Sequence, residues 1–193
     1  MVVAADLKAG MVVRIDADLY RVVSAEYHAG GGKMSGATHA KLRNLQTGPL
    51  LERRFRPDER LQDVDLDRVM MQYLYQDGDE YYFMDTKSFE QVSLPERMIG
   101  PAVKFLLPEM LLPVELFEGK PVSVIFPEFI DLKVRMTAQP IHTQQDSTMK
   151  PATLENGIEV LVPQFIKPGE TVRVEAETGR YLERVRVDEK KGS

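Results

Sequence analysis

The chain has 193 residues, 43% of them apolar and 28% charged, with a formal net charge of −5 and no cysteine. This composition is typical of a globular protein with one large or two to three small domains, and the lack of cysteine excludes disulfides, thiolate metal sites and cysteine nucleophiles. No apolar run is long enough to span a bilayer, and Asp6 interrupts the N-terminal segment where a signal peptide needs its apolar region. We therefore expect a cytoplasmic protein that does not associate with a membrane.

Residues 1–64 read as a compact β unit. Apolar and polar residues alternate in residues 11–27, with Val12 and Val22 among the apolar positions, and again in residues 40–45. Alternation of this kind predicts half-buried strands. The glycine-rich segment between the two strands is therefore expected to be the turn of a hairpin.

Lys33 lies in this turn, among the glycines Gly30, Gly31, Gly32 and Gly36. Glycine adopts positive φ at low cost, so the tip of the hairpin can be narrow and long. A lysine there is a compact charge on a flexible stem, suited to reach phosphate or a polar reaction centre and open to modification. On local sequence alone, an ordinary turn with a solvated lysine is the commoner case.

A nucleotide-binding loop is excluded at Lys33. Such a loop needs serine or threonine after the lysine and a helix downstream. Here Met34 follows the lysine, and the downstream segment reads as a strand. Further along, Arg53, Arg54 and Arg56 surround Phe55, and we interpret this basic cluster as a solvated strand face rather than an RNA contact.

A second unit spans residues 65–129 and begins with a hairpin that turns at Asp77-Gly78. Its strands are dense in aromatic residues, which we expect to form a cross-strand core and rim rather than a base-stacking surface. Residues 93–107 are the best helical segment of the chain, with Ser93 as the expected cap. The aromatic residues are Tyr73, Tyr75, Tyr81, Tyr82 and Phe83.

The third unit, residues 130–193, opens with a polar loop and continues as strands separated by turns at Pro168-Gly169 and Gly179. It ends in a charged tail that we expect to be solvated. All three units are therefore predicted to be β, and the domain boundaries are predicted at 64/65 and 129/130.

Charge and motifs give no support for enzyme chemistry. Residues 1–64 carry 10 basic and 8 acidic side chains, residues 65–129 carry 5 and 12, and residues 130–193 carry 10 of each. The acidic middle segment would be repelled by RNA unless it faced protein, which argues against a general single-stranded RNA binder.

The histidines His28, His39 and His142 are scattered, so we expect no metal site. No nucleophile motif is present, and a Schiff-base role for Lys33 would require burial that a hairpin tip does not offer.

Four segments resemble the bacterial elongation factor P family, a relative of the hypusine-bearing initiation factor of archaea and eukaryotes. They are DLKAGMVVRIDADLYRVV, AKLRNLQTG, YLYQDGDEYYFMD and KPATLENGIEVLVPQFIKPGETVRVEAETGRYLERV. The resemblance covers nearly the whole chain, and the last segment is long and specific. It implies an all-β protein of three small β-barrel domains in an L shape that mimics a tRNA: an SH3-like, KOW-type N-terminal barrel followed by two OB-fold domains.

The resemblance also implies a function and a set of partners. A member of the family is expected to be a translation elongation factor, not an enzyme, that works without a cofactor as a monomer. It binds both ribosomal subunits beside the P-site tRNA, stimulates peptide-bond formation and relieves stalling at consecutive prolines. The factor supplies positioning while the ribosome performs the chemistry.

Carried onto this chain, the resemblance assigns roles to three residues. Lys33, with Gly31, Gly32 and Met34 around it, matches the family's lysine loop, which reaches the CCA end of the tRNA and is a site of post-translational modification by a dedicated enzyme. Tyr181 and Arg184 match a G-x-Y-x-x-R motif expected near the small subunit and the tRNA anticodon arm. A tyrosine and an arginine there can stack on and pair with RNA, or can be an ordinary strand-edge pair.

Two loops depart from the family pattern. The family loop often reads P-G-K-G, whereas this chain has no proline before Lys33 and has Met34 after it, in a hairpin one residue longer. Many members carry a Gly-Asp-Thr loop at the E-site codon, whereas this chain offers Asp146-Ser147-Thr148. These departures keep open an alternative: a divergent paralogue that serves fewer messages or works without lysine modification.

Overall fold

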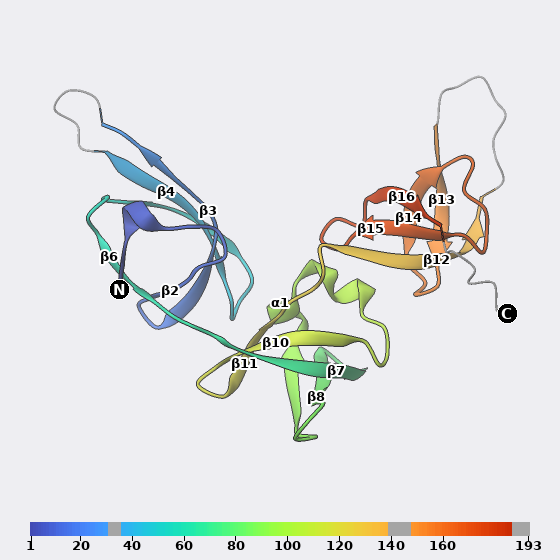
Figure 1. Ribbon diagram of the computed structural model, residues 1–193, viewed down its shortest axis with the longest axis horizontal. Helices are drawn as coiled ribbons and strands as arrows, with labels where there is room; N and C mark the ends of the chain where they lie inside the picture. Colours follow the sequence, from blue (N-terminus) through green and yellow to red (C-terminus); the bar gives the residue numbers. More distant parts are fainter. Residues whose placement is uncertain (31–35, 139–147, 187–193) are drawn as a thin grey trace, which may run out of the picture. The chain divides into compact units, whose positions relative to one another are not determined.

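Three antiparallel β-sheets follow one another along the chain in the computed structural model (Figure 1), which describes residues 1–30, 36–138 and 148–186. The predicted all-β fold class is thus confirmed. The helical segments described are one four-residue α-helix and two short 3₁₀ turns. Within the described ranges, no helix is long and apolar enough to cross a membrane.

The first sheet has six strands in the order β1-β6-β2-β3-β4-β5. Its inner core is a cluster of small and branched apolar side chains around Phe55, which is 1% exposed. The strands are β1 (Val2–Val3), β2 (Val12–Ile15), β3 (Asp18–His28), β4 (Ala37–Asn44), β5 (Leu50–Phe55) and β6 (Arg60–Asp63), and the 3₁₀ turn η1 (Ala4–Asp6) follows β1.

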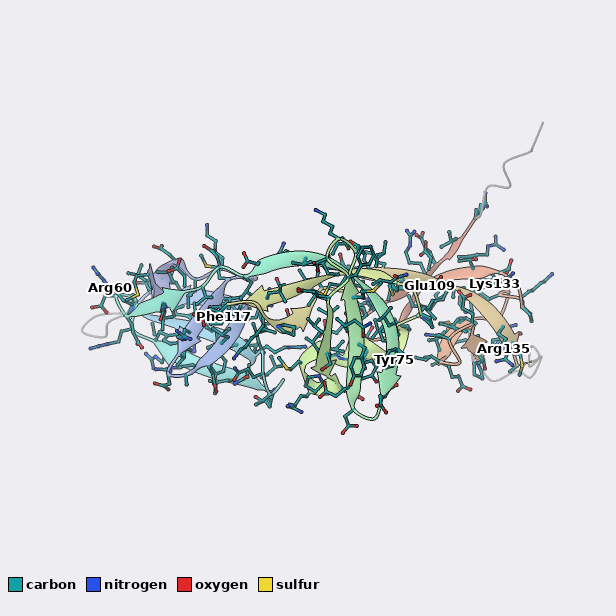
Figure 2. All side chains as sticks on the ribbon, turned by 90° about the horizontal axis from the view of Figure 1, so that it is seen from below. Arg60, Tyr75, Glu109, Phe117, Lys133 and Arg135 are labelled. Atoms are coloured by element: carbon teal, nitrogen blue, oxygen red, sulfur yellow. The ribbon has the colours of Figure 1, made fainter. Side chains whose placement is uncertain are left out.

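The second sheet has five strands in the order β11-β10-β7-β8-β9. Its strands are β7 (Asp67–Asp77), β8 (Glu80–Asp85), β9 (Gln91–Pro95), β10 (Leu111–Phe117) and β11 (Lys120–Val124), with helix α1 (Glu96–Ile99) after β9. The aromatic residues of its first hairpin divide between two faces. Tyr73, Tyr81 and Phe83 are buried, as expected for the core, whereas Tyr75 (Figure 2) stacks on Tyr82 with ring centroids 4.7 Å apart and is 49% exposed.

The prediction of one helix over residues 93–107 is wrong. Ser93 lies in β9 and caps nothing, and helix α1 has Pro95 before its first residue and no side-chain cap. The helix ends after four residues because Gly100 has φ +89°, and Pro101 next to it cannot donate a backbone hydrogen bond. The chain then continues as the 3₁₀ turn η2 (Pro101–Phe105). Apolar spacing alone had suggested one helix across this break.

The third sheet also has five strands, in the order β14-β13-β12-β15-β16. It is built from β12 (Phe129–Thr137), β13 (Met149–Leu154), β14 (Glu159–Pro163), β15 (Thr171–Glu175) and β16 (Tyr181–Val185). Alternate residues of β12 are buried, which agrees with its apolar–polar alternation in sequence. Strand β16 contacts β14, so the two ends of the sheet approach each other as in a barrel.

The chain divides into two compact units. The first contains Met1–Gly100 and Glu109–Ile125, and so holds the first two sheets, while the second contains Pro101–Pro108 and Phe126–Ser193. Within the first unit, a second apolar cluster lies between the two sheets. Val12 belongs to this cluster with Leu19, Leu45 and Val122, whereas its neighbour Val13 belongs to the inner core of the first sheet. The domain boundaries predicted at 64/65 and 129/130 stay predictions.

Candidate functional site

In sequence, the glycine-rich segment lies between β3 and β4, the two longest paired strands of the first sheet. Strands β3 and β4 pair from Tyr20 opposite Asn44 to His28 opposite Ala37, and β5 pairs along the other edge of β4. Figure 1 shows β3 and β4 side by side up to the turn. The hairpin predicted from alternation is therefore confirmed. Gly31, Gly32, Lys33 and Met34 lie outside the described residues, so their assigned roles stay predictions.

Gly36, next to the loop end of the paired strands, is needed for space. A Cβ atom built on Gly36 would lie 2.5 Å from the Tyr27 hydroxyl and 2.8 Å from its ring. The φ of Gly36 is outside the left-handed range, so the conformational freedom expected from sequence is not what this position uses. Any side chain there would displace Tyr27, which is itself 55% exposed. At this end of the hairpin, the Tyr27 ring therefore packs directly over Gly36.

Two histidines that look scattered in sequence lie together on the hairpin. The rings of His28 and His39 are 4.9 Å apart and nearly perpendicular, and Glu26 lies opposite His39 in the register. The carboxylate of Glu26 is 3.7 Å from Nε2 of His28. Strand register brings these side chains together, and sequence spacing alone did not reveal it. Among the described residues, no group of three or more metal-binding side chains forms; His142 lies outside them.

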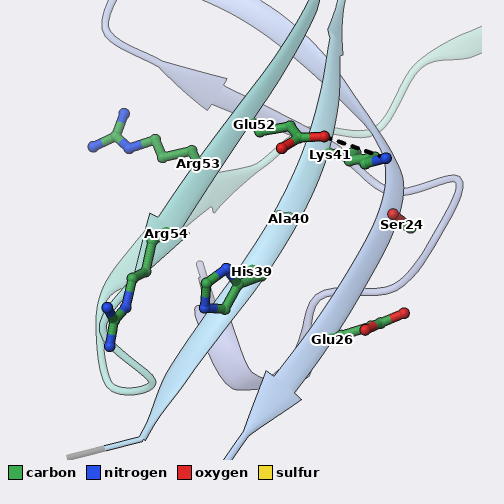
Figure 3. A pocket seen from close by; sticks show the side chains of 8 residues that line it. All are labelled: Ser24, Glu26, His39, Ala40, Lys41, Glu52, Arg53 and Arg54. Carbon is green, nitrogen blue, oxygen red and sulfur yellow. Dashed lines mark ion pairs between the residues drawn. The ribbon is translucent and has the colours of Figure 1, made fainter.

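A shallow hollow of about 450 Å³ covers the outer face of β3, β4 and β5 (Figure 3). Cross-strand pairs form its floor: His39 is opposite Arg54, and Lys41 is opposite Glu52. The Lys41 ammonium and the Glu52 carboxylate are 3.2 Å apart, and both side chains are exposed. The hollow is lined by Ser24, Glu26, His39, Ala40, Lys41, Glu52, Arg53 and Arg54. This face has mixed charge and is open to solvent, so it is a surface for contact rather than an enclosed site for a small molecule.

The cluster around Phe55 is a solvated strand face, as predicted. Phe55 is buried, while the arginines on either side are exposed. The guanidinium of Arg53 lies over the Phe55 ring, 4.9 Å from its centroid, and 3.6 Å from Glu59. These contacts hold the arginine along the sheet.

Tyr181 and Arg184 are brought together on β16, opposite Val174 and Val172 of β15. Arg184 donates from Nη1 to Oε1 of Glu170 at 3.0 Å, and its guanidinium lies 5.7 Å from the centre of the Phe165 ring. Arg184 is therefore already oriented by a carboxylate and a ring. An RNA phosphate at this position would have to compete with Glu170 for the guanidinium.

The titration behaviour of this cluster follows from its contacts. Partial burial raises the pKa of the Tyr181 phenol above its ordinary value, although the charge of Arg184 opposes the rise. The pKa of Glu170 is lowered, first by the backbone N–H of Lys167 and then by Arg184. At neutral pH, the site therefore offers a neutral phenol beside a paired guanidinium. Such a pair can stack on a base and contact phosphate, and the role assigned to both residues stays a prediction.

Three family models match the chain in succession. The elongation factor P KOW-like domain matches residues 3–61, the elongation factor P OB domain matches residues 66–124, and the elongation factor P C-terminal model matches residues 130–184. The first sheet is thus KOW-like, and the second is an OB domain.

Curated relatives match over nearly the full length. Elongation factor P of Clostridium kluyveri is 39% identical over 96% of this chain and 100% of its own, and that of Acidobacterium capsulatum is 38% identical over 94% and 97%. A solved structure of translation initiation factor 5A from Methanococcus jannaschii aligns with a TM-score of 0.49 at 22% identity, over 64% of this chain and 92% of that one. A TM-score below 0.5 is too low to support a shared fold. By the family models and the full-length relatives, the chain belongs to the elongation factor P family of translation elongation factors.

Proposed function

We propose that the protein binds the ribosome beside the P-site tRNA and stimulates peptide-bond formation when consecutive prolines stall it. The observation that carries the proposal is the long β3–β4 hairpin on a KOW-like domain of this family, with a glycine-rich sequence that contains a lysine between its strands. In this proposal the protein works in the cytoplasm as a monomer, touches both ribosomal subunits and uses no cofactor.

The hairpin supplies reach, and the lysine supplies charge. The eight residue steps from Tyr20 to His28 in β3 extend about 26 Å at about 3.3 Å per residue. Strand β5 pairs with β4 from Arg43 to Thr38, so the hairpin is two-stranded only at its end, where His28 pairs with Ala37. In this proposal, that narrow end enters a cleft that a whole domain cannot. Lys33 beyond it would contact the CCA end of the tRNA and hold the peptidyl substrate in a reactive geometry. Proline is a poor nucleophile of fixed shape, so the benefit would come from orientation and reduced entropy.

The third sheet supplies the second anchor in this proposal. Tyr181 and Arg184 would lie near the small subunit and the anticodon arm, with Arg184 exchanging its Glu170 partner for phosphate. The acidic second sheet would then face protein or solvent rather than RNA.

Purified translation of a reporter with a short proline run tests the proposal. The native protein should relieve the stall, and Lys33→Ala should abolish the relief. Lys41→Ala is the matched control. It removes a lysine from the same hairpin, but from the face of the sheet, where Lys41 pairs with Glu52. The proposal fails if the native protein binds ribosomes and gives no relief, or if the Lys33 and Lys41 variants behave alike.

The alternative, a paralogue with narrower targets or without lysine modification, is favoured by the sequence Gly31-Gly32-Lys33-Met34. Mass spectrometry of the peptide containing Lys33, from protein isolated from its own cells, would show whether a group is attached. An unmodified lysine in a protein that still relieves proline stalls would establish the modification-free form. Relief confined to a few stall sequences would establish the narrow-target form.

A further inference from the structure

A buried ionic cluster joins the first sheet to the second. The side chain of Glu115, on β10, is 2% exposed. Its carboxylate accepts hydrogen bonds from the guanidinium of Arg21, on β3 of the first sheet, and from the hydroxyl of Ser123, on β11. Arg68 donates to it from Nε at 3.3 Å. Burying a carboxylate is unfavourable unless such donors replace the water that it loses, so this cluster is a built contact.

Only one donor of the cluster comes from the first sheet. Glu115 lies directly opposite Ser123 on β11 and Arg68 on β7, so these two contacts follow from the register of the second sheet itself. Arg21 is 94 residues away in sequence and reaches Glu115 from β3. Arg21 also donates to the Ser123 hydroxyl at 3.4 Å. Within this cluster, Arg21 is therefore the one residue that links the first sheet to the second.

The rest of the contact between the two sheets is mostly apolar. Val12, Leu19 and Leu45 of the first sheet pack with Val122 of the second, and Phe117 borders the cluster. The guanidinium of Arg14 lies 5.3 Å from the centre of the Phe117 ring. Apolar packing is non-directional, so it restricts the rotation of two surfaces less sharply than a hydrogen bond between two defined atoms does. The charge-assisted hydrogen bond from Nη2 of Arg21 to the Glu115 carboxylate supplies such a direction.

Arg21 lies on β3, the strand that ends at His28 next to the glycine-rich segment. Seven residue steps separate Arg21 from His28, which is about 23 Å at about 3.3 Å per residue. Over that length, a rotation of about 10° at Arg21 moves the end of the strand by about 4 Å. Misplacement of a reacting group by about 1 Å already lowers catalysis about 100-fold. The hairpin can be effective only if its sheet is held at a defined angle.

We propose that Arg21 and Glu115 are positioning residues, which lock the first sheet onto the second and thereby aim the hairpin. Neither residue would touch a ligand. The lock itself stands on the contacts above, and its effect on peptide-bond formation rests on the proposed function. The proposal adds a requirement at residues outside the lysine loop and outside the Tyr181 and Arg184 site.

Distances between spin labels in the full chain test the lock. The protein has no cysteine, so labels can be placed cleanly at Asp58→Cys in the first sheet region and Asp77→Cys at the end of β7, both of them exposed. Arg21→Gln should broaden the distance distribution at least twofold. Arg68→Gln is the matched control, because it removes an arginine from the same carboxylate but from within the second sheet, and it should leave the distribution narrow.

Folding is monitored in the same samples by amide NMR spectra of the core strands. Arg21→Lys, which keeps the charge, should restore most of the narrow distribution. If Arg21→Gln does not fold, the double variant Arg21→Met with Glu115→Leu replaces it, since it removes the ion pair and leaves neither charge buried, and it should broaden the distribution as well. A distribution as narrow as that of the native protein in a folded Arg21→Gln, or in the double variant that replaces it, overturns the proposal.

The translation assay, run on the same variants, tests the consequence. We expect Arg21→Gln to lose at least tenfold in relief of proline stalls, and Arg68→Gln to stay within twofold of the native protein. Broadened distances with native relief would overturn the positioning role. If the native protein gives no relief at all, the proposed function fails, and the distance measurement alone decides whether the lock exists.

Discussion

Two arginines, Arg21 and Arg173, bind carboxylates in similar ways and in opposite surroundings. Arg21 crosses from one sheet to another and meets a carboxylate that is 2% exposed. Arg173 lies within the third sheet, where it binds Asp131 through two hydrogen bonds of 2.7 and 2.9 Å and Glu183 at 2.9 Å, and these side chains are 37–59% exposed. By geometry alone, Arg173 has the better contacts.

The comparison shows that surroundings, more than hydrogen-bond count, decide what an ion pair does. Water screens the Arg173 contacts and can replace them when they break, so they add little to stability. Water cannot easily replace Arg21 at the buried Glu115 carboxylate. We therefore expect the loss of Arg21 to destabilise the first unit strongly, and the loss of Arg173 to destabilise the third sheet only weakly.

The largest effect is expected from Arg21→Gln. It should lower the free energy of unfolding of the first unit by about 3 kcal/mol, at the lower end of the range for breaking a buried ion pair, because Arg68 and Ser123 remain at Glu115. Urea unfolding followed by far-UV circular dichroism measures it. Replacing both partners, as Arg21→Met with Glu115→Leu, should recover most of the loss, since no charge is then left buried. A double variant as unstable as the single one would contradict this account.

The next effect is expected from Gly48→Ala, in the same contact between the first sheet and the second. Gly48 has φ +89°, and a Cβ there would lie 2.9 Å from the carbonyl oxygen of Arg97, which is backbone and cannot swing away. We expect a loss of about 1–3 kcal/mol from the strained backbone and the clash. Gly10→Ala is the matched control, because Gly10 has φ +90° and nothing within 4 Å of its Cβ position. Equal losses at the two glycines would show that strain alone matters and that the contact is loose.

Sequence patterns predicted what is local in this fold. The β3–β4 hairpin follows from alternation on both sides of a glycine-rich segment. The burial of Tyr73 and Phe83 follows from a different rule, that aromatic residues in paired strands pack across the strands. The false helix shows the limit of such rules, since a single glycine at positive φ, followed by proline, overrode the apolar spacing.

What lies between sheets could not be predicted in the same way. Glu115 is buried on β10, and one of its partners, Arg21 on β3, is 94 residues away in sequence. One signal was present and was missed: Val12 and Val13 break the alternation, and the structure buries them in two different clusters. Consecutive buried valines indicate a strand covered on both faces. The roles assigned to Lys33, Tyr181 and Arg184 came from family resemblance, which physical patterns alone did not supply.

The smallest effect is expected at the exposed pair. The side chain of Arg173, first by its hydrogen bonds and then by its charge, holds the pKa of Asp131 below its ordinary value of 3.8. A carboxyl group with a lowered pKa stabilises the folded state above the unfolded pKa and loses this contribution as pH falls through the folded pKa. Asp131→Asn should therefore lower stability by less than about 1 kcal/mol at pH 7, and by less still at a pH well below the ordinary pKa of 3.8. Thermal unfolding at both pH values measures the difference, and a second series in 0.5 M salt tests screening, because an exposed ion pair should weaken further in salt.

A loss of stability at pH 7 as large as that of Arg21→Gln, and insensitive to salt, would mean that solvent exposure does not decide how much each arginine contributes. The distinction between a lock and a surface pair would then have to be abandoned.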